Sequence, residues 1–278
     1  MQKVAIVTDC ASGIPREIAE ELGIVRIPLQ VVMDGKAYTS GKDISSQEVY
    51  SAMRGGKVLK TTQPLVPDIK EGYEKALSMA DKVLSVHIGS RLTSTVQTCR
   101  MVAESMAPDR IRVVDSSTLT MMYGLACIKA ARKAATGCIL EEAAAIVEDT
   151  LSRIRGWLAV PSLKHLAQSG RVSKVLSGLS TLLSVKVILR MEGGEVQLED
   201  KYRSSSLAFG KLRDLALDSC GGKAQALVFV HGDDPGNARE LEELIMRSVK
   251  CDDIFRTDLG PVVSIHTGPD PFGVAVLP

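Results

Sequence analysis

Short β-rich runs alternate with amphipathic helical patterns along the first half of the chain. The run KVAIVT at 3–8 predicts a strand, and Pro15 opens a helix after it. The ten residues IVRIPLQVVM at 24–33 predict a single second strand, which ends at the turn signal Asp34-Gly35. Strands that alternate with helices indicate a largely parallel sheet with right-handed crossovers.

The same alternation continues as far as residue 154. The helix expected at about 119–136 is apolar nearly all round, so we expect it to be deeply buried. The remaining elements are strands at 82–88 and 110–115, with helices from Pro67, over about 96–106 and over about 140–154.

The second half of the chain predicts a sheet of mixed direction. Two runs, 185–190 and 195–200, are joined through Gly193-Gly194 as a hairpin, which makes neighbouring strands antiparallel. The other expected elements are strands at 156–160, 224–230, 253–258, 261–266 and 273–278, with helices at about 204–219 and 236–249. The sequence therefore predicts an α/β protein with two α/β domains, 1–155 with a mainly parallel Rossmann-like sheet and 156–278 with a mixed sheet and helices.

Composition narrows the class of protein. The 278 residues are 45% hydrophobic and 24% charged with a net charge of +1, so we expect a globular protein whose overall field recruits neither nucleic acid nor an anionic membrane. Because the start lacks a signal-peptide pattern and no apolar run reaches about 18 residues, we expect a cytoplasmic protein. The six cysteines and four histidines are scattered without ligand spacing, which predicts no metal site.

Small hydroxyl side chains gather where predicted strands end. Three strands end in TDCAS (8–12), GSRLTST (89–95) and DSSTLT (115–120), and the loop KTTQP adds residues 60–64. Ligands of a parallel sheet bind beyond the carboxyl ends of its strands, and helix starts there expose unpaired N–H groups. Hydroxyl donors beside helix starts favour an anion.

The absence of phosphate-binding motifs narrows the chemical class of that anion. The chain has no glycine-rich loop of the kind that binds nucleotide phosphates, because there is no GxGxxG after the first strand and no GxxxxGK[ST] anywhere. Arg91 is the one basic residue between Gly89 and Gln97, which suits a single carboxylate held by neutral donors better than a diphosphate.

Two other interpretations stay open at this point. Serine and threonine before a helix are commonly N-caps without a ligand, and Asp9 and Asp115 are expected to organise their loops. A hydroxyl-nucleophile enzyme acting on a small acid or acyl ester is the alternative function, although no GxSxG or HExxH is present. His266, among turn residues, fits a structural role as well as a functional one.

Several segments, taken in order, resemble the DegV family of bacterial fatty-acid-binding proteins. The opening VTDCASGIP resembles the family's VTDSTADLP, TTQPL its TSQPS loop, and GSRLTST its SSxLSGT segment. Asp115-Ser116, the SGRV turn at 169–172 and HTGP at 266–269 also match family patterns, so the resemblance covers essentially the whole chain.

The resemblance implies a carrier without catalytic residues or a cofactor. A long-chain fatty acid such as palmitate would lie between the two domains, with its carboxylate at the loops of domain 1–155 and its acyl chain enclosed by domain 156–278. A separate fatty-acid kinase would phosphorylate the bound acid for phospholipid synthesis, and transient membrane contact would suit such a carrier. By position, the carboxylate would meet Thr61, Thr62, Thr93, Ser94 and His266, while Arg171 and Arg203 would serve partner docking.

This chain departs from the family pattern at several places. Thr93-Ser94 replaces the usual Ser-Gly, which adds a donor and bulk, and Leu65 replaces a serine. Asp270 interrupts the terminal glycine-rich turn, and we expect its side chain to face solvent, since a negative charge turned inward would repel a carboxylate.

Overall fold

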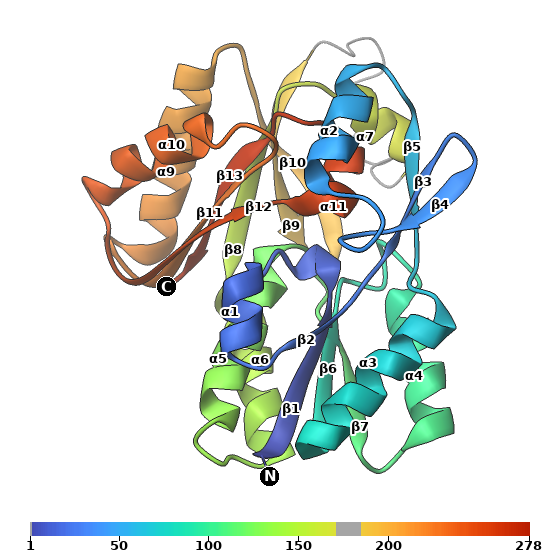
Figure 1. Cartoon of the computed structure of the whole chain (residues 1–278). Coiled ribbons are helices and arrows are strands. Elements are labelled where there is room, and N and C mark those ends of the chain that lie inside the picture. The colour runs from blue at the N-terminus through green and yellow to red at the C-terminus, as the bar shows by residue number, and fades with distance from the viewer. Residues whose placement is uncertain (1, 171–184) are drawn as a thin grey trace.

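Three β-sheets lie along an elongated molecule in this computed structural model, which describes residues 2–170 and 185–278 (Figure 1). A parallel sheet occupies one end, a larger mixed sheet the other, and a small antiparallel sheet lies beside the mixed one. The α/β class, the parallel first sheet and the mixed second sheet are thereby confirmed.

The first sheet has the order β2-β1-β6-β7 with all neighbours parallel. One apolar cluster packs α3 and α4 on one face, and a second packs α5 and α6 on the other. As expected, α5 is buried nearly all round. The elements are β1 (Gln2–Asp9), η1 (Cys10–Ser12), α1 (Arg16–Glu21), β2 (Val25–Ile27), α3 (Val66–Met79), β6 (Ala80–His87), α4 (Thr95–Met106), β7 (Ile111–Asp115), α5 (Met121–Ala134) and α6 (Leu140–Arg153).

The second sheet has the order β10-β9-β8-β13-β11-β12, in which only the β11–β12 pair is parallel. Helices α9 and α10 cover its outer face, and α11 and α7 lie on the side toward the small sheet (Figure 1). The elements are β8 (Arg155–Val160), α7 (Lys164–Ser169), β9 (Lys186–Glu192), β10 (Glu195–Tyr202), α9 (Ser205–Cys220), β11 (Lys223–His231), α10 (Gly236–Met246), β12 (Lys250–Asp258), α11 (Gly260–Thr267) and β13 (Phe272–Leu277).

The prediction of one strand over 24–33 is wrong. Pro28 cannot donate a ladder hydrogen bond, and the chain leaves the first sheet there, so β2 and β3 belong to different sheets. The small sheet has the order β4-β3-β5 and includes Thr61 and Thr62, which the sequence placed in a loop. Its elements are β3 (Gln30–Met33), β4 (Lys36–Thr39) and β5 (Leu59–Thr62), with helix α2 (Ser46–Arg54) inserted before β5.

The strand expected at 261–266 is wrong as well, because this segment is the helix α11. Pro261 occupies its first turn, and Gly260 and Gly268 have positive φ values of 75° and 95° at its two ends. These end signals outweigh the β propensity of PVVSIH. As a helix, the segment places residues 263, 266 and 267 on one face, which a strand would not do.

A buried hydrogen-bond network fixes the carboxyl ends of β1 and β6. The Asp9 carboxylate accepts from the Ala11 and Ile88 N–H groups at 3.0 and 3.1 Å and from the Tyr123 hydroxyl at 2.6 Å. It also contacts His87 Nδ1 at 3.0 Å, and both side chains are fully buried. Asp9 therefore organises its loop, as expected from the sequence.

The passage from α6 to β8 at residue 155 is where the chain moves from the first sheet to the second. The division into domains 1–155 and 156–278 stays a prediction. Across the described ranges, 2–170 and 185–278, no helix has the length and hydropathy that crossing a membrane requires.

Candidate functional site

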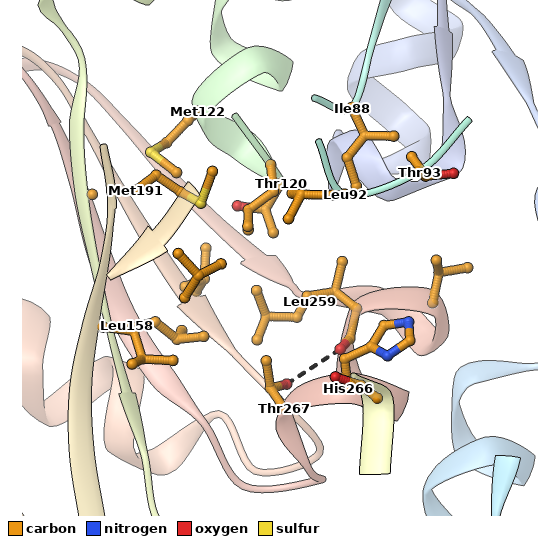
Figure 2. A pocket seen from close by; sticks show the side chains of 18 of the residues that line it. Ile88, Leu92, Thr93, Thr120, Met122, Leu158, Met191, Leu259, His266 and Thr267 are labelled. Atoms are coloured by element: carbon orange, nitrogen blue, oxygen red, sulfur yellow. Dashed lines mark hydrogen bonds between the residues drawn. The ribbon is translucent and has the colours of Figure 1, made fainter. Parts of the chain in front are cut away.

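A cavity of about 400 Å³ lies between the two larger sheets, and residues of β5 in the small sheet also line it. This volume falls in the range typical of small-molecule sites, roughly 300–1,000 Å³. Loops at the ends of β6 and β7 form one side, and the six-stranded sheet with α11 forms the other (Figure 2). The position agrees with the rule that ligands bind beyond the carboxyl ends of parallel strands.

Most of the cavity wall is apolar. Figure 2 shows the thioethers of Met122 and Met191 next to each other on one side, with Leu158 below them on the sheet and Leu259 near α11. Such a wall attracts a hydrocarbon, because each buried methylene gains about 0.8 kcal/mol. The apolar residues are Leu29, Ile88, Leu92, Leu119, Met122, Trp157, Leu158, Leu166, Leu189, Met191, Val196, Val230, Leu259, Val262, Val263, Val274 and Ala275.

Thr61 and His266 meet at the polar end of the cavity. The Thr61 hydroxyl lies 2.8 Å from His266 Nε2, so a hydrogen bond joins the small sheet to α11. Helix α11 is held in place from the other side by Tyr50, whose hydroxyl donates to Asp258 at 2.6 Å and contacts Ser264 at 3.0 Å. Contacts from Tyr50 and Thr61 thus position the histidine.

Ser94 and its neighbours form a second polar group at the same cavity. The Ser94 hydroxyl donates to Gln63 Oε1 at 2.5 Å, and Thr98 donates to the same oxygen at 3.0 Å. Thr93 lies 3.0 Å from Thr95, oxygen to oxygen. These bonds orient the hydroxyls of the 93–95 segment, and they can be exchanged for bonds to a bound anion.

Two helices begin at this cavity. Ser94 is the N-cap of α4, Thr120 is the N-cap of α5, and both line the cavity. The first-turn N–H groups of a helix carry a partial positive charge that favours an anion. Thr120 has a φ of 54°, a conformation that a β-branched residue rarely adopts, and such strain is concentrated at functional sites.

Charged side chains are rare among the described residues that line the cavity. Among the described lining residues, Arg190 alone carries a permanent charge, and its guanidinium donates to Glu199 at 2.8 Å and to Glu192 at 2.7 Å. The polar end therefore relies on hydroxyls, an amide, an imidazole and helix starts. That combination suits one carboxylate, as the sequence predicted.

The structure brings the predicted head-group residues to one cavity, since all of them line it. Their contact with a carboxylate stays a prediction. The TDCAS loop does not join them, because the Thr8 hydroxyl is buried and donates to the Val86 carbonyl at 2.8 Å. The five residues are Thr61, Thr62, Thr93, Ser94 and His266.

Four further uncharged polar residues of the described chain line the cavity and were not among the predicted head-group residues, namely Gln63, Thr120, Ser169 and Thr267. Gln63 lies in the KTTQP segment at 60–64, whose threonines alone were predicted to meet the carboxylate. Thr267 was hidden because α11 was expected to be a strand, in which residues 266 and 267 would face opposite sides.

The remaining predictions concern residues outside the cavity. Asp270 forms an ion pair with Arg54 at 2.6 Å and is 45% exposed, so the expectation that it faces solvent is confirmed. Asp115 accepts from Ser90 N and Oγ and from Ser117 N, which confirms its role in organising its loop. Arg203 is exposed just before α9, and Arg171 lies outside the described residues, so their docking role stays a prediction.

For Ser94, the hydroxyl-nucleophile alternative gains no support from the geometry. Ser94 donates to an amide oxygen, which cannot act as a general base, and His266 contacts Thr61. In the part of the chain that the structure covers, no three His, Cys, Asp or Glu side chains are grouped as metal ligands would be.

The fold and the cavity define a class of α/β proteins that enclose an apolar chamber with one polar end between two sheets. The chain belongs to the DegV family: residues 3–278 match the family model described as "Uncharacterised protein, DegV family". A DegV domain-containing protein of Caldanaerobacter subterraneus is 34% identical over 99% of this chain and 98% of its own length. A second one, from Streptomyces coelicolor, is 30% identical, covering 98% of each chain.

Solved structures of the family superpose closely on this chain. A DegV family protein from Thermus thermophilus, described for its fatty acid binding, gives a TM-score of 0.91 at 27% identity, with 99% of each chain covered. A Thermotoga maritima protein that "reveals fatty acid binding function" gives 0.88 at 25% identity, covering 100% of this chain and 99% of its own.

Proposed function

We propose that this protein binds a long-chain fatty acid, with the acyl chain in the apolar cavity and the carboxylate at its polar end. The observation that carries the proposal is the geometry of the cavity, which combines a largely apolar wall with hydroxyls, an imidazole and two helix starts. The fatty acid binding described for similar DegV proteins supports it.

The energetics fit a carrier. Burying some 12–14 methylenes at about 0.8 kcal/mol each yields roughly 10 kcal/mol before the costs of ordering the chain. Loss of translation and of chain flexibility consumes part of this gain. A net affinity in the micromolar range, about 8 kcal/mol, is consistent with this balance. The tail thus supplies most of the attraction, and the polar end sets the orientation.

The second part of the proposal is presentation of the carboxylate to a separate fatty-acid kinase. In that step a carboxylate oxygen attacks the γ-phosphorus of ATP held by the kinase, the new O–P bond forms, and the bond to ADP breaks. This protein contributes no atom to the reaction and acts as a carrier rather than an enzyme. The kinase partner and the cytoplasmic location belong to this proposal.

The direct test is a denaturing mass spectrum of protein purified from cells. We expect an acyl chain to be released, and we expect delipidated protein to take up palmitate in a native mass spectrum. Delipidated protein that binds no saturated or unsaturated fatty acid would overturn the proposal.

The head-group assignment predicts a selective loss when hydroxyls are removed. In the double variant Thr61→Val with Thr93→Val, two donors disappear while side-chain shape is kept, so palmitate affinity should fall about tenfold or more. Binding of the uncharged hexadecanol should change little, because its tail contacts are intact. The matched control is Thr136→Val, at an exposed threonine whose hydroxyl donates to the Lys133 carbonyl. Equal losses for the acid and the alcohol would contradict the assignment.

A further inference from the structure

A separate cavity of about 420 Å³ lies where segments of all three sheets meet. We call it the junction cavity, and its lining comes from the segments 10–16, 26–28, 40–46 and 257–261. Among the described residues it shares no lining residue with the cavity between the two larger sheets. Its volume suits a small molecule rather than a lone ion.

The walls of the junction cavity are fixed relative to one another. The Thr257 hydroxyl donates to the Gly13 carbonyl at 2.6 Å, which ties the end of β12 to the loop that follows β1. Prolines, whose ring fixes φ, contribute to the lining from three of the four segments. A cavity with rigid walls loses little conformational entropy when a ligand binds. The prolines are Pro15, Pro28 and Pro261.

Positive charge predominates in the junction cavity. Its cationic lining residues are Arg16, Arg26 and Lys42, whereas Asp258 alone carries a negative charge among the described lining residues. Arg26 Nη1 donates to the Ile14 carbonyl at 3.0 Å, which holds the guanidinium at the wall. Within residues 2–170 and 185–278, the other N–H groups of this guanidinium donate to no protein atom, so they can donate to a ligand.

The other two cations have partners that an anion can replace. Arg16 pairs with Glu20 at 2.6 Å, but both side chains are mostly exposed, and surface pairs of this kind are weak. Lys42 Nζ lies 3.7 Å from one carboxylate oxygen of Asp68 and from one of Glu71, which is long for a hydrogen bond. Guanidinium and ammonium groups donate charge-assisted bonds to phosphate oxygens, so the three cations together favour a phosphate group.

Asp258 adds an acceptor to this cationic cavity. Its Oδ1 accepts from the Tyr50 hydroxyl at 2.6 Å and from the Gly260 N–H at 2.5 Å. Its Oδ2 has no hydrogen-bond partner in the part of the chain that the structure describes. A carboxylate repels a bare anion but accepts from a hydroxyl, and the buried Ser40 hydroxyl lies in the same lining. The residues thus favour a ligand that combines a phosphate with hydroxyl groups.

We propose that the junction cavity binds a small polyol phosphate, such as a sugar phosphate. The phosphate accepts from Arg26 and Lys42, and the ligand hydroxyls donate to Asp258 and exchange hydrogen bonds with Ser40. This site does not depend on the proposed fatty-acid binding, because the two cavities have separate linings in the described chain.

The test is isothermal titration of the full-length protein, in a buffer without phosphate, with glucose 6-phosphate, glucose and inorganic phosphate as probes. Glucose 6-phosphate should bind about tenfold or more tightly than either of the other two, since only it engages both groups of residues. The double variant Arg26→Gln with Lys42→Gln should bind it about tenfold or more weakly than wild type, while palmitate affinity stays within about twofold. Raising the salt concentration should weaken glucose 6-phosphate binding to wild type.

The matched control is the double variant Lys133→Gln with Arg247→Gln. It removes the same two kinds of charge from the last turn of α5 and the end of α10, outside both cavities, and should bind all probes as wild type does. Circular dichroism checks that both double variants are folded. If Arg26→Gln with Lys42→Gln unfolds, Lys42→Gln alone, at an exposed side chain, should still weaken glucose 6-phosphate binding about threefold or more.

Three results would overturn the site. The first is wild-type protein that binds no glucose 6-phosphate at about 10 mM. The second is a folded Lys42 variant, single or double, that binds it as wild type does. The third is inorganic phosphate that binds as tightly as glucose 6-phosphate, because the hydroxyl contacts would then contribute nothing. None of these results bears on palmitate uptake, which is measured separately and tests the proposed function.

Discussion

The variant Leu158→Asp should lose fatty-acid binding by more than about 100-fold, because the acyl chain would strip water from a carboxylate that has no partner, at a cost of several kcal/mol. Leu158 lies on β8 and points into the apolar part of the cavity (Figure 2). Isothermal titration of delipidated protein with palmitate measures the loss.

The matched control for this position is Leu158→Met, which keeps an apolar side chain of similar volume and should change affinity by only a few-fold. Circular dichroism of both variants without lipid checks that the fold persists. Palmitate affinity in Leu158→Asp within about threefold of wild type would show that the tail does not lie against β8.

The variant Asp9→Ala should lower the free energy of unfolding by about 3–5 kcal/mol, since truncation leaves buried donors and a buried imidazole without their acceptor. The loss should depend on pH. Burial lowers the pKa of His87, but contacts with Cys99 and Asp9 outweigh it and raise the pKa to about 10. The folded pKa exceeds the ordinary value of 6.5, so this stabilisation is fully present below pH 6.5 and is lost as the pH rises through 10.

Urea unfolding at several pH values measures both effects. The difference between wild type and Asp9→Ala should shrink as the pH rises from about 6.5 to 10. The control Asp149→Ala removes an exposed carboxylate paired with Arg153 on α6 and should cost about 0–1 kcal/mol. A loss in Asp9→Ala as small as in the control would mean that the buried network does not stabilise the fold.

The sequence predicted correctly those helices and strands whose apolar residues recur at regular spacing. The strands β1, β6 and β7 and the buried helix α5 were predicted because their apolar residues recur at the expected spacing and because turn signals bound them. The clustering of polar loops at one end of the first sheet follows from the parallel direction of its strands.

The small sheet and α11 were missed for a common physical reason. Local β propensity does not reveal where Pro28 redirects the chain, nor that Gly260 and Pro261 start a helix in a run of β-branched residues. Helix α2 had a readable signal, since Ser45 and Glu48 form a capping box. The pairing of Thr61 with His266 depends on tertiary packing and could not be read from spacing.

The Thr61–His266 contact joins residues 205 positions apart, and the Tyr50–Ser264 contact joins residues 214 apart. At ordinary rates of synthesis, residues 50–62 emerge from the ribosome roughly 10–40 s before their partners in α11 exist. During that interval the cavity lacks the wall that α11 supplies. The cavity can therefore be completed only after nearly the whole chain has been synthesised.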